Sequence, residues 1–125
     1  MNMNSRAKAT WVGIVTILLT GLIHGIEAPD AFEDASYKGW LFVANLLAGV
    51  LCAAAMYRRV RWGWWFGFFL AATTAAGYVA SRTVGLPGLP AEPDAWLEPA
   101  GVASLVVETV FIASFIVSRR RTMNE

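Results

Sequence analysis

The chain has 125 residues, of which 57% are hydrophobic and only 15% charged. This length accommodates one small helical bundle and leaves no room for an additional soluble domain. The single cysteine, Cys52, excludes an internal disulfide and any cysteine-based metal motif. The net charge of +1 is uninformative as a sum, so only the placement of the charges helps to assign a class.

Four long apolar runs organise the chain, and they cover residues 9–26, 39–57, 62–81 and 100–118. Each run has about 18–20 residues, and at about 1.5 Å rise per residue such a helix is as long as the hydrocarbon core of a bilayer is thick. A single segment crosses lipid as a helix because only a helix satisfies all its backbone hydrogen bonds internally. The sequence therefore predicts an all-α protein: one transmembrane up-down four-helix bundle over residues 1–125.

The charges predict the orientation of this bundle. Eight of the ten basic residues lie on one side in this topology: Arg6, Lys8, Arg58, Arg59, Arg61, Arg119, Arg120 and Arg121. The other side carries seven acidic residues against only Lys38 and Arg82. By the positive-inside rule both termini are cytoplasmic, as expected for a multi-pass protein of a bacterial inner membrane. Topology and attraction to anionic lipid account for the basic clusters, so nucleic-acid binding has no support.

Small residues recur at helical spacing in the two central runs and predict how these helices pack. They are Gly63, Gly67, Ala71 and Ala75 in the third run, and Asn45, Gly49 and Ala53 in the second. Small side chains let two helix backbones approach closely in lipid. Because a short basic connection joins the two runs, we expect the two stripes to face each other.

The two connections on the acidic side carry all five prolines. In the first, residues 27–38, we expect Pro29 to end the preceding helix and to begin a short surface helix with Phe32 and Tyr37 turned to lipid. The second, residues 82–99, holds four prolines and predicts an extended, stiff cap.

Five polar residues of the outer half are candidates for one outward-opening polar pocket: His24, Asn45, Tyr78, Arg82 and Glu108. Glu108 lies about 12 Å below the outer end of its helix, near the midplane, where an ionisable group is costly and often functional. A structural alternative is that Glu108 is protonated and hydrogen-bonds to Asn45, Tyr78 or Ser104, holding helices together. Arg82, with a reach of about 6–7 Å, falls short of Glu108 unless the helices are staggered.

A divalent metal is a further alternative for these residues. His24, Glu27 and Glu108 offer nitrogen and oxygen ligands suited to zinc, iron or manganese. The expected helix break at Pro29 and the presence of a single histidine count against such a site and against a haem. No phosphate-binding loop, nucleophile elbow or zinc-protease motif is present in the sequence.

Two outer segments carry a resemblance to a known group of proteins. They are residues 24–37, with Pro29, and residues 81–87, Ser-Arg-Thr-Val-Gly-Leu-Pro. On these segments the chain resembles uncharacterised four-span membrane proteins of actinobacteria and similar bacteria, and this implies that the outer residues matter together without implying an activity. Small multidrug antiporters share the size and one membrane glutamate, but theirs lies in the first span.

We interpret the sequence as a non-enzymatic subunit or binding module of a homo-oligomer or a larger membrane complex, with an outward-opening polar pocket. One alternative is a metal- or cofactor-dependent redox or hydrolytic membrane enzyme that uses His24 and Glu108. Another is an oligomeric proton-coupled transporter with Glu108 as the proton carrier. The sequence does not identify a ligand, a cofactor or a partner.

Overall fold

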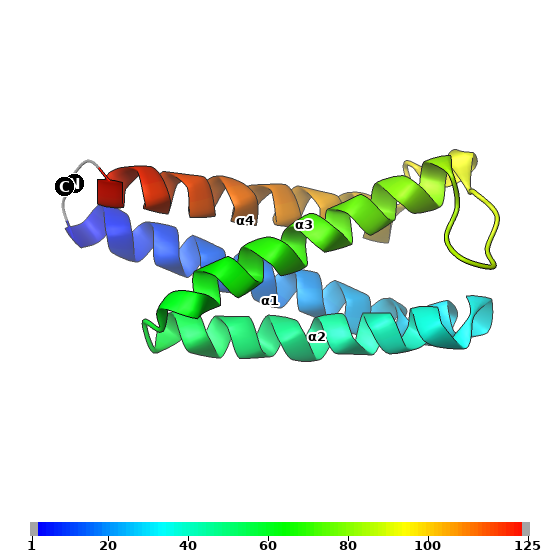
Figure 1. The fold of residues 1–125 in the computed structure, drawn as a ribbon, viewed down its shortest axis with the longest axis horizontal. Coiled ribbons are helices and arrows are strands. Elements are labelled where there is room, and N and C mark those ends of the chain that lie inside the picture. Colours follow the sequence, from blue (N-terminus) through cyan, green and yellow to red (C-terminus); the bar gives the residue numbers. More distant parts are fainter. Residues whose placement is uncertain (1–2, 124–125) are drawn as a thin grey trace.

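The computed structural model describes residues 3–123, and over this range the chain forms helices and no strand. Four long helices follow one another up and down: α1 (Met3–Asp34), α2 (Ser36–Tyr57), α3 (Arg61–Thr83) and α4 (Pro99–Met123). A short 3-10 helix, η1 (Pro93–Ala95), precedes α4 (Figure 1). The predicted all-helical fold is confirmed.

Helix α1 does not end at Pro29, so the predicted break is wrong. It continues to Asp34, and Ala35 alone separates it from α2. A proline inside a helix removes one backbone hydrogen bond, but packing on neighbouring helices offsets this cost. Here Ala28 and Ala31 are buried, and the Phe32 ring contacts Gly39 of α2 while it stays 37% exposed.

The small residues bring the helices close together, but not in the predicted pairs. A side chain at Gly49 of α2 would meet the Ile17 carbonyl oxygen of α1 at 2.9 Å, so Gly49 faces α1 rather than α3. Gly67 of α3 is covered by the Phe111 ring of α4, and only Gly63 packs on α2, against Met56. The two stripes therefore do not face each other along their whole length, because Gly49 packs on α1 and Gly67 on α4.

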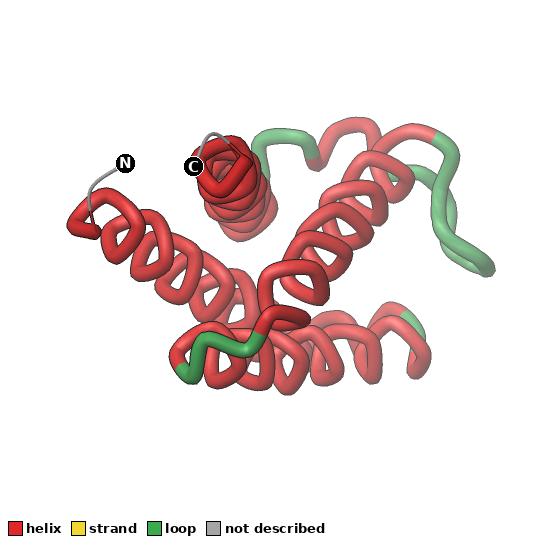
Figure 2. Tube along the Cα trace, turned by 60° about the vertical axis from the view of Figure 1, so that its left-hand side comes forward, coloured by secondary structure: helices red, strands yellow, loops and turns green. Residues whose placement is uncertain are grey.

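The path of α3 explains this difference. It starts beside α2, crosses the bundle and ends near the start of α4 (Figures 1 and 2). The two close contacts of its glycines follow that path, first on α2 at Gly63 and then on α4 at Gly67. The core side chains come from all four long helices: Ile14, Ile17, Cys52, Ala53, Met56, Ala71, Phe111 and Phe115.

The connection between α3 and α4 folds back on itself and is not extended. Gly85 and Gly88 have φ values of 88° and 75°, a region that L side chains rarely adopt, and the Leu89 nitrogen donates to the Leu86 carbonyl. The Glu92 nitrogen donates to the Ser81 carbonyl at 2.9 Å, which returns the chain to the end of α3.

Within residues 3–123, three helices are long and apolar enough to cross a membrane: α1 from Ser5 to Asp34, α2, and α4 from Pro99 to Arg120. The protein is thus a helical bundle with the character of an integral membrane protein. Over the described residues α3 is not among these candidates. Its first half is rich in tryptophan and glycine, and its second half carries Thr73, Thr74, Tyr78, Ser81 and Arg82, so its mean hydropathy is lower.

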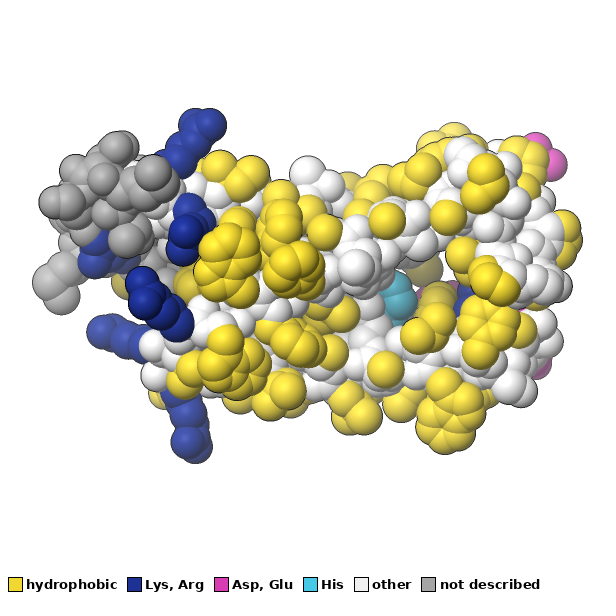
Figure 3. All heavy atoms as spheres, viewed as in Figure 1, with side chains coloured by type: hydrophobic (Ala, Val, Ile, Leu, Met, Phe, Trp, Pro, Cys, Tyr) yellow, Lys and Arg dark blue, Asp and Glu magenta, His cyan; other side chains and the backbone are white. Residues whose placement is uncertain are grey.

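Charge divides the bundle into two ends. Lysine and arginine side chains gather where α1 begins and α4 ends (Figure 3), which we call the basic end. The acidic side chains of residues 27–34 and 92–98 lie at the opposite end, which we call the acidic end.

Candidate functional site

A cavity of about 560 Å³ opens at the acidic end, between α1 and α2 on one side and α3 with the start of α4 on the other. His24, Asn45, Tyr78 and Arg82 all line it, and so does Glu27. Glu108 is not among the lining residues, although Ser104, one turn before it on α4, is. Four of the five predicted pocket residues therefore share one cavity.

The continuous α1 supplies one wall of this cavity. His24, Glu27, Ala31 and Asp34 follow one another at spacings of three and four residues and all line it. Such spacing places side chains on one face of a helix, and it holds across Pro29 because α1 does not break there. The fold thus brings His24 and Glu27 onto one face, which the sequence left in doubt.

Asn45 and Thr74 join α2 to α3 at the cavity wall. The Thr74 hydroxyl donates to the Leu70 carbonyl at 2.6 Å, so its oxygen accepts the bond from Nδ2 of Asn45 at 2.8 Å. A hydroxyl has a single proton to donate, which fixes the amide orientation and leaves Oδ1 as the free atom. Asn45 is only 7% exposed, and its Oδ1 is buried without any hydrogen-bond partner.

His24 presents a second acceptor to the cavity. Its Nδ1 lies 2.8 Å from the Thr20 carbonyl oxygen. Because a carbonyl only accepts, Nδ1 carries the proton, and in the neutral ring Nε2 then holds a free lone pair. The ring packs edge-on against Phe42 at 4.8 Å between centroids, which holds it in place.

Glu108 lies between α1 and α4, beyond the cavity wall, and is only 1% exposed. Its Oε2 accepts hydrogen bonds from Ser104 and, at 3.3 Å, from Thr20 of α1. Of the three partners predicted for a structural Glu108, the structure shows Ser104. Asn45 instead donates to Thr74 of α3, and the Tyr78 hydroxyl donates to the Trp96 carbonyl beside η1.

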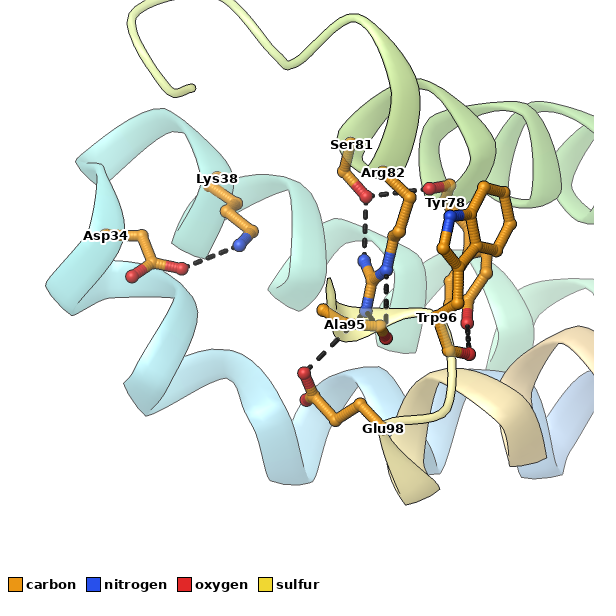
Figure 4. A network of polar contacts seen from close by, with 8 residues as sticks. All are labelled: Asp34, Lys38, Tyr78, Ser81, Arg82, Ala95, Trp96 and Glu98. Atoms are coloured by element: carbon orange, nitrogen blue, oxygen red, sulfur yellow. Dashed lines mark hydrogen bonds and ion pairs between the residues drawn. The ribbon is translucent and has the colours of Figure 1, made fainter. Parts of the chain in front are cut away.

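Arg82 holds the cap of the cavity in place (Figure 4). Its Nε and Nη2 both donate to the Ala95 carbonyl at 3.3 Å, and Nη1 donates to Oγ of Ser81 at 2.7 Å. Nη2 also lies 3.7 Å from Oε2 of Glu98, and the guanidinium carbon sits 4.1 Å from the centre of the Tyr78 ring. Arg82 is thereby committed to residues near η1 and does not reach Glu108.

The charges around the cavity are unequal. Five acidic residues line it, Glu27, Asp30, Asp34, Glu92 and Glu98, against two basic ones, Lys38 and Arg82. Both basic residues are paired, Lys38 with Asp34 at 2.7 Å and Arg82 with Glu98. Within residues 3–123 the remaining three carboxylates have no ion-pair partner, so the cavity rim is negatively charged.

The predicted metal ligands are not brought together. Over residues 3–123 no group of three or more histidine, cysteine, aspartate or glutamate side chains is placed to hold one ion. His24 and Glu27 share a wall of the cavity, but the Glu108 carboxylate points at Thr20 and Ser104 between α1 and α4. The set His24, Glu27 and Glu108 therefore does not form one shell.

The sequence interpretation missed Thr74, Phe42 and Lys38, which help to form the cavity. Thr74 lies four residues before Tyr78, and this spacing on one helix face was an available signal.

Comparisons with protein-family models, with curated proteins and with solved structures gave no match for this chain. The resemblance to uncharacterised four-span proteins stays a prediction.

Proposed function

We propose that this protein is a four-span membrane protein in which α3 crosses the bilayer together with α1, α2 and α4. Both termini are then cytoplasmic, and the acidic end lies outside. Helix α3 has 23 residues, about 34 Å at the usual rise, which is enough for a bilayer core. Its polar side chains Thr74, Tyr78 and Arg82 line the cavity, so lipid need not solvate them. Trp62, Trp65, Phe66 and Phe69 are among its exposed side chains and suit contact with lipid.

We further propose that the protein acts as a non-enzymatic binding module that receives a small ligand from the outer side. The cavity at the acidic end is the observation that supports this function. Its volume of about 560 Å³ falls within the range of about 300–1,000 Å³ that is usual for small-molecule sites. Its wall combines apolar side chains with the free acceptors of His24 and Asn45, which would orient a ligand.

The module would belong to a homo-oligomer or a larger complex of a bacterial cytoplasmic membrane. Large apolar side chains are exposed along each of the four long helices, for example Leu22, Leu47, Phe69 and Val106. Such surfaces suit lipid and neighbouring membrane helices equally well.

The test uses the protein purified in lipid nanodiscs and native mass spectrometry, which detects a bound small molecule whatever its charge. Ala48→Trp places a large side chain in the cavity, and Leu47→Trp adds the same side chain one position away, where Leu47 is 64% exposed and lines no cavity. We expect adducts on the wild type and on Leu47→Trp, and none on Ala48→Trp. Absence of any adduct, or equal adducts on both variants, would contradict a binding module.

Glu108 supports a second candidate function, proton-coupled transport. Its carboxyl is almost fully buried near the middle of α4 and hydrogen-bonds to Ser104, which lines the cavity. An intramembrane carboxyl next to a ligand cavity is the arrangement that a proton carrier requires.

A further inference from the structure

We infer that the ligand of the cavity is an organic ammonium ion that carries at least one N–H group and an apolar body. This inference rests on the proposed binding function and names the chemical class that the cavity accepts. Three sets of residues support it: two unfilled hydrogen-bond acceptors in the wall, a negatively charged rim, and an apolar lining.

The unfilled acceptors call for a ligand that donates hydrogen bonds. Oδ1 of Asn45 is buried and unpartnered, while Nδ2 is held by Thr74. Nδ1 of His24 is engaged by the Thr20 carbonyl, which leaves Nε2 of the neutral ring as an acceptor. A buried acceptor without a partner is costly, and a ligand N–H group would remove that cost.

The rim adds attraction for a positive charge. Glu27 lies on the same face of α1 as His24, one turn closer to the opening, and it is half-buried. Asp30 lies a further turn out, and Glu92 contributes from the cap. None of these three carboxylates has an ion-pair partner within the described part of the chain. Carboxylates beside low-dielectric walls attract cations more strongly than they do in open water.

An anionic ligand is disfavoured because the basic groups of the cavity are already used. The Arg82 guanidinium is bound by the Ala95 carbonyl, Ser81 and Glu98, and its side chain is 14% exposed. Lys38 pairs with Asp34. An anion would have to displace these contacts and would still face the unpaired carboxylates of the rim.

The apolar part of the lining explains why the ligand needs an apolar body. Side chains from α1, α2, α3 and the connection after α3 supply it: Ile23, Leu41, Phe42, Leu70 and Leu86. A small hydrated cation would gain nothing from this surface, whereas an alkyl or aryl group would be removed from water against it. The amine can be a free molecule or the headgroup of a lipid such as phosphatidylethanolamine.

The experiment compares three probes of similar shape by calorimetric titration of the wild-type protein in phosphatidylcholine nanodiscs. The probes are 2-phenylethylammonium, its N,N,N-trimethyl analogue, which keeps the charge but has no N–H group, and 3-phenylpropionate, which is an anion. We expect the primary ammonium to bind about tenfold or more tightly than the trimethyl analogue, and the anion not to bind. Equal binding of the two cations, or preference for the anion, would overturn the inference.

Matched variants assign the effect to the cavity. Glu27→Gln removes one charge from the rim, and Glu33→Gln removes the same charge from an exposed position of α1 outside the cavity. We expect about fivefold or greater weakening of 2-phenylethylammonium binding for Glu27→Gln and little change for Glu33→Gln. His24→Asn keeps a donor near the Thr20 carbonyl but removes Nε2, and it should weaken the primary ammonium more than the trimethyl analogue. Equal effects of both glutamate variants would contradict the assignment.

The source of the amine follows from repeating the titration in nanodiscs that contain phosphatidylethanolamine. Competition by this lipid would show that a lipid headgroup fills the cavity, and unchanged binding of the probe would show that the site takes a free amine. If native mass spectrometry shows a bound molecule while the probes reveal no preference for N–H cations, the binding module stands and its ligand class is wrong. If neither method shows binding, both proposals fail.

Discussion

Nδ2 of Asn45 lies 2.8 Å from Oγ1 of Thr74, and this bond joins α2 to α3 beside the cavity. The Thr74 hydroxyl donates its own hydrogen bond to the Leu70 carbonyl, so it can only accept from the amide, and the amide oxygen points away from Thr74. One hydrogen bond thereby performs two tasks: it holds the α1–α2 pair to α3 where the bundle opens, and it leaves an acceptor for a ligand.

The Asn45–Thr74 bond should contribute measurably to stability. Thr74→Val keeps the shape of the side chain but leaves the Asn45 amide without its acceptor, and we expect a loss of about 1 kcal/mol in the free energy of unfolding in detergent. Thr73→Val is the control, since Thr73 bonds only to carbonyls of its own helix and is exposed. Equal loss in both variants would show that the interhelical bond is not the cause.

Gly67 should tolerate no larger side chain, because the Phe111 ring of α4 covers it. Gly67→Leu must push α3 away from α4, and we expect a destabilisation of about 1–3 kcal/mol, measured as a lower thermal midpoint in detergent. Gly77→Leu is the matched control, since no atom lies within 4 Å of the position its Cβ would take. A wild-type midpoint for Gly67→Leu would contradict the packing of α3 on α4.

Arg82 should control the order of the cap. Arg82→Lys retains the charge but loses the forked donors that reach Ala95 and Ser81 together. We expect faster hydrogen exchange of the Glu92 amide, which bonds to the Ser81 carbonyl, with little change in the core of α4. The same change at Arg58, exposed at the basic end, should leave the exchange of Glu92 as it is in the wild type.

Glu108 separates the structural from the transport interpretation. Glu108→Gln keeps the shape of the protonated acid but carries no exchangeable charge, so we expect a thermal midpoint close to that of the wild type. Glu108→Leu leaves Thr20 and Ser104 without their acceptor and should lose about 1–3 kcal/mol. Ligand-driven proton movement in vesicles that is present in the wild type and absent in Glu108→Gln would instead establish a proton carrier.

The number of spans can be measured directly by labelling cysteines introduced one at a time in a Cys52→Ala background. We expect Ser5→Cys and Arg59→Cys to react with an impermeant reagent only from the cytoplasm, and Ala91→Cys only from outside. Ala91 decides whether α3 crosses, because residue 91 follows α3 and residue 59 precedes it. Labelling of Ala91→Cys from the cytoplasm would show that α3 does not cross the membrane.

The sequence by itself determined where the helices lie, because an apolar run of sufficient length is a local property. The predicted run 62–81 falls within α3, and 100–118 falls within α4. The sequence also indicated the group of polar residues at one end, of which His24, Asn45, Tyr78 and Arg82 line one cavity.

Only the tertiary structure decided which surfaces meet and which polar atoms are left free. Whether a proline ends a helix depends on packing against a neighbour, and α1 passes Pro29 because Ala28 and Ala31 are buried there. Glycine stripes allow close helix contact but do not specify which helix makes it. The path of α3 across the bundle places Gly67 against Phe111 of α4. The free acceptor of Asn45 depends on its bond to Thr74, a residue 29 positions away in the sequence, which no local pattern encodes.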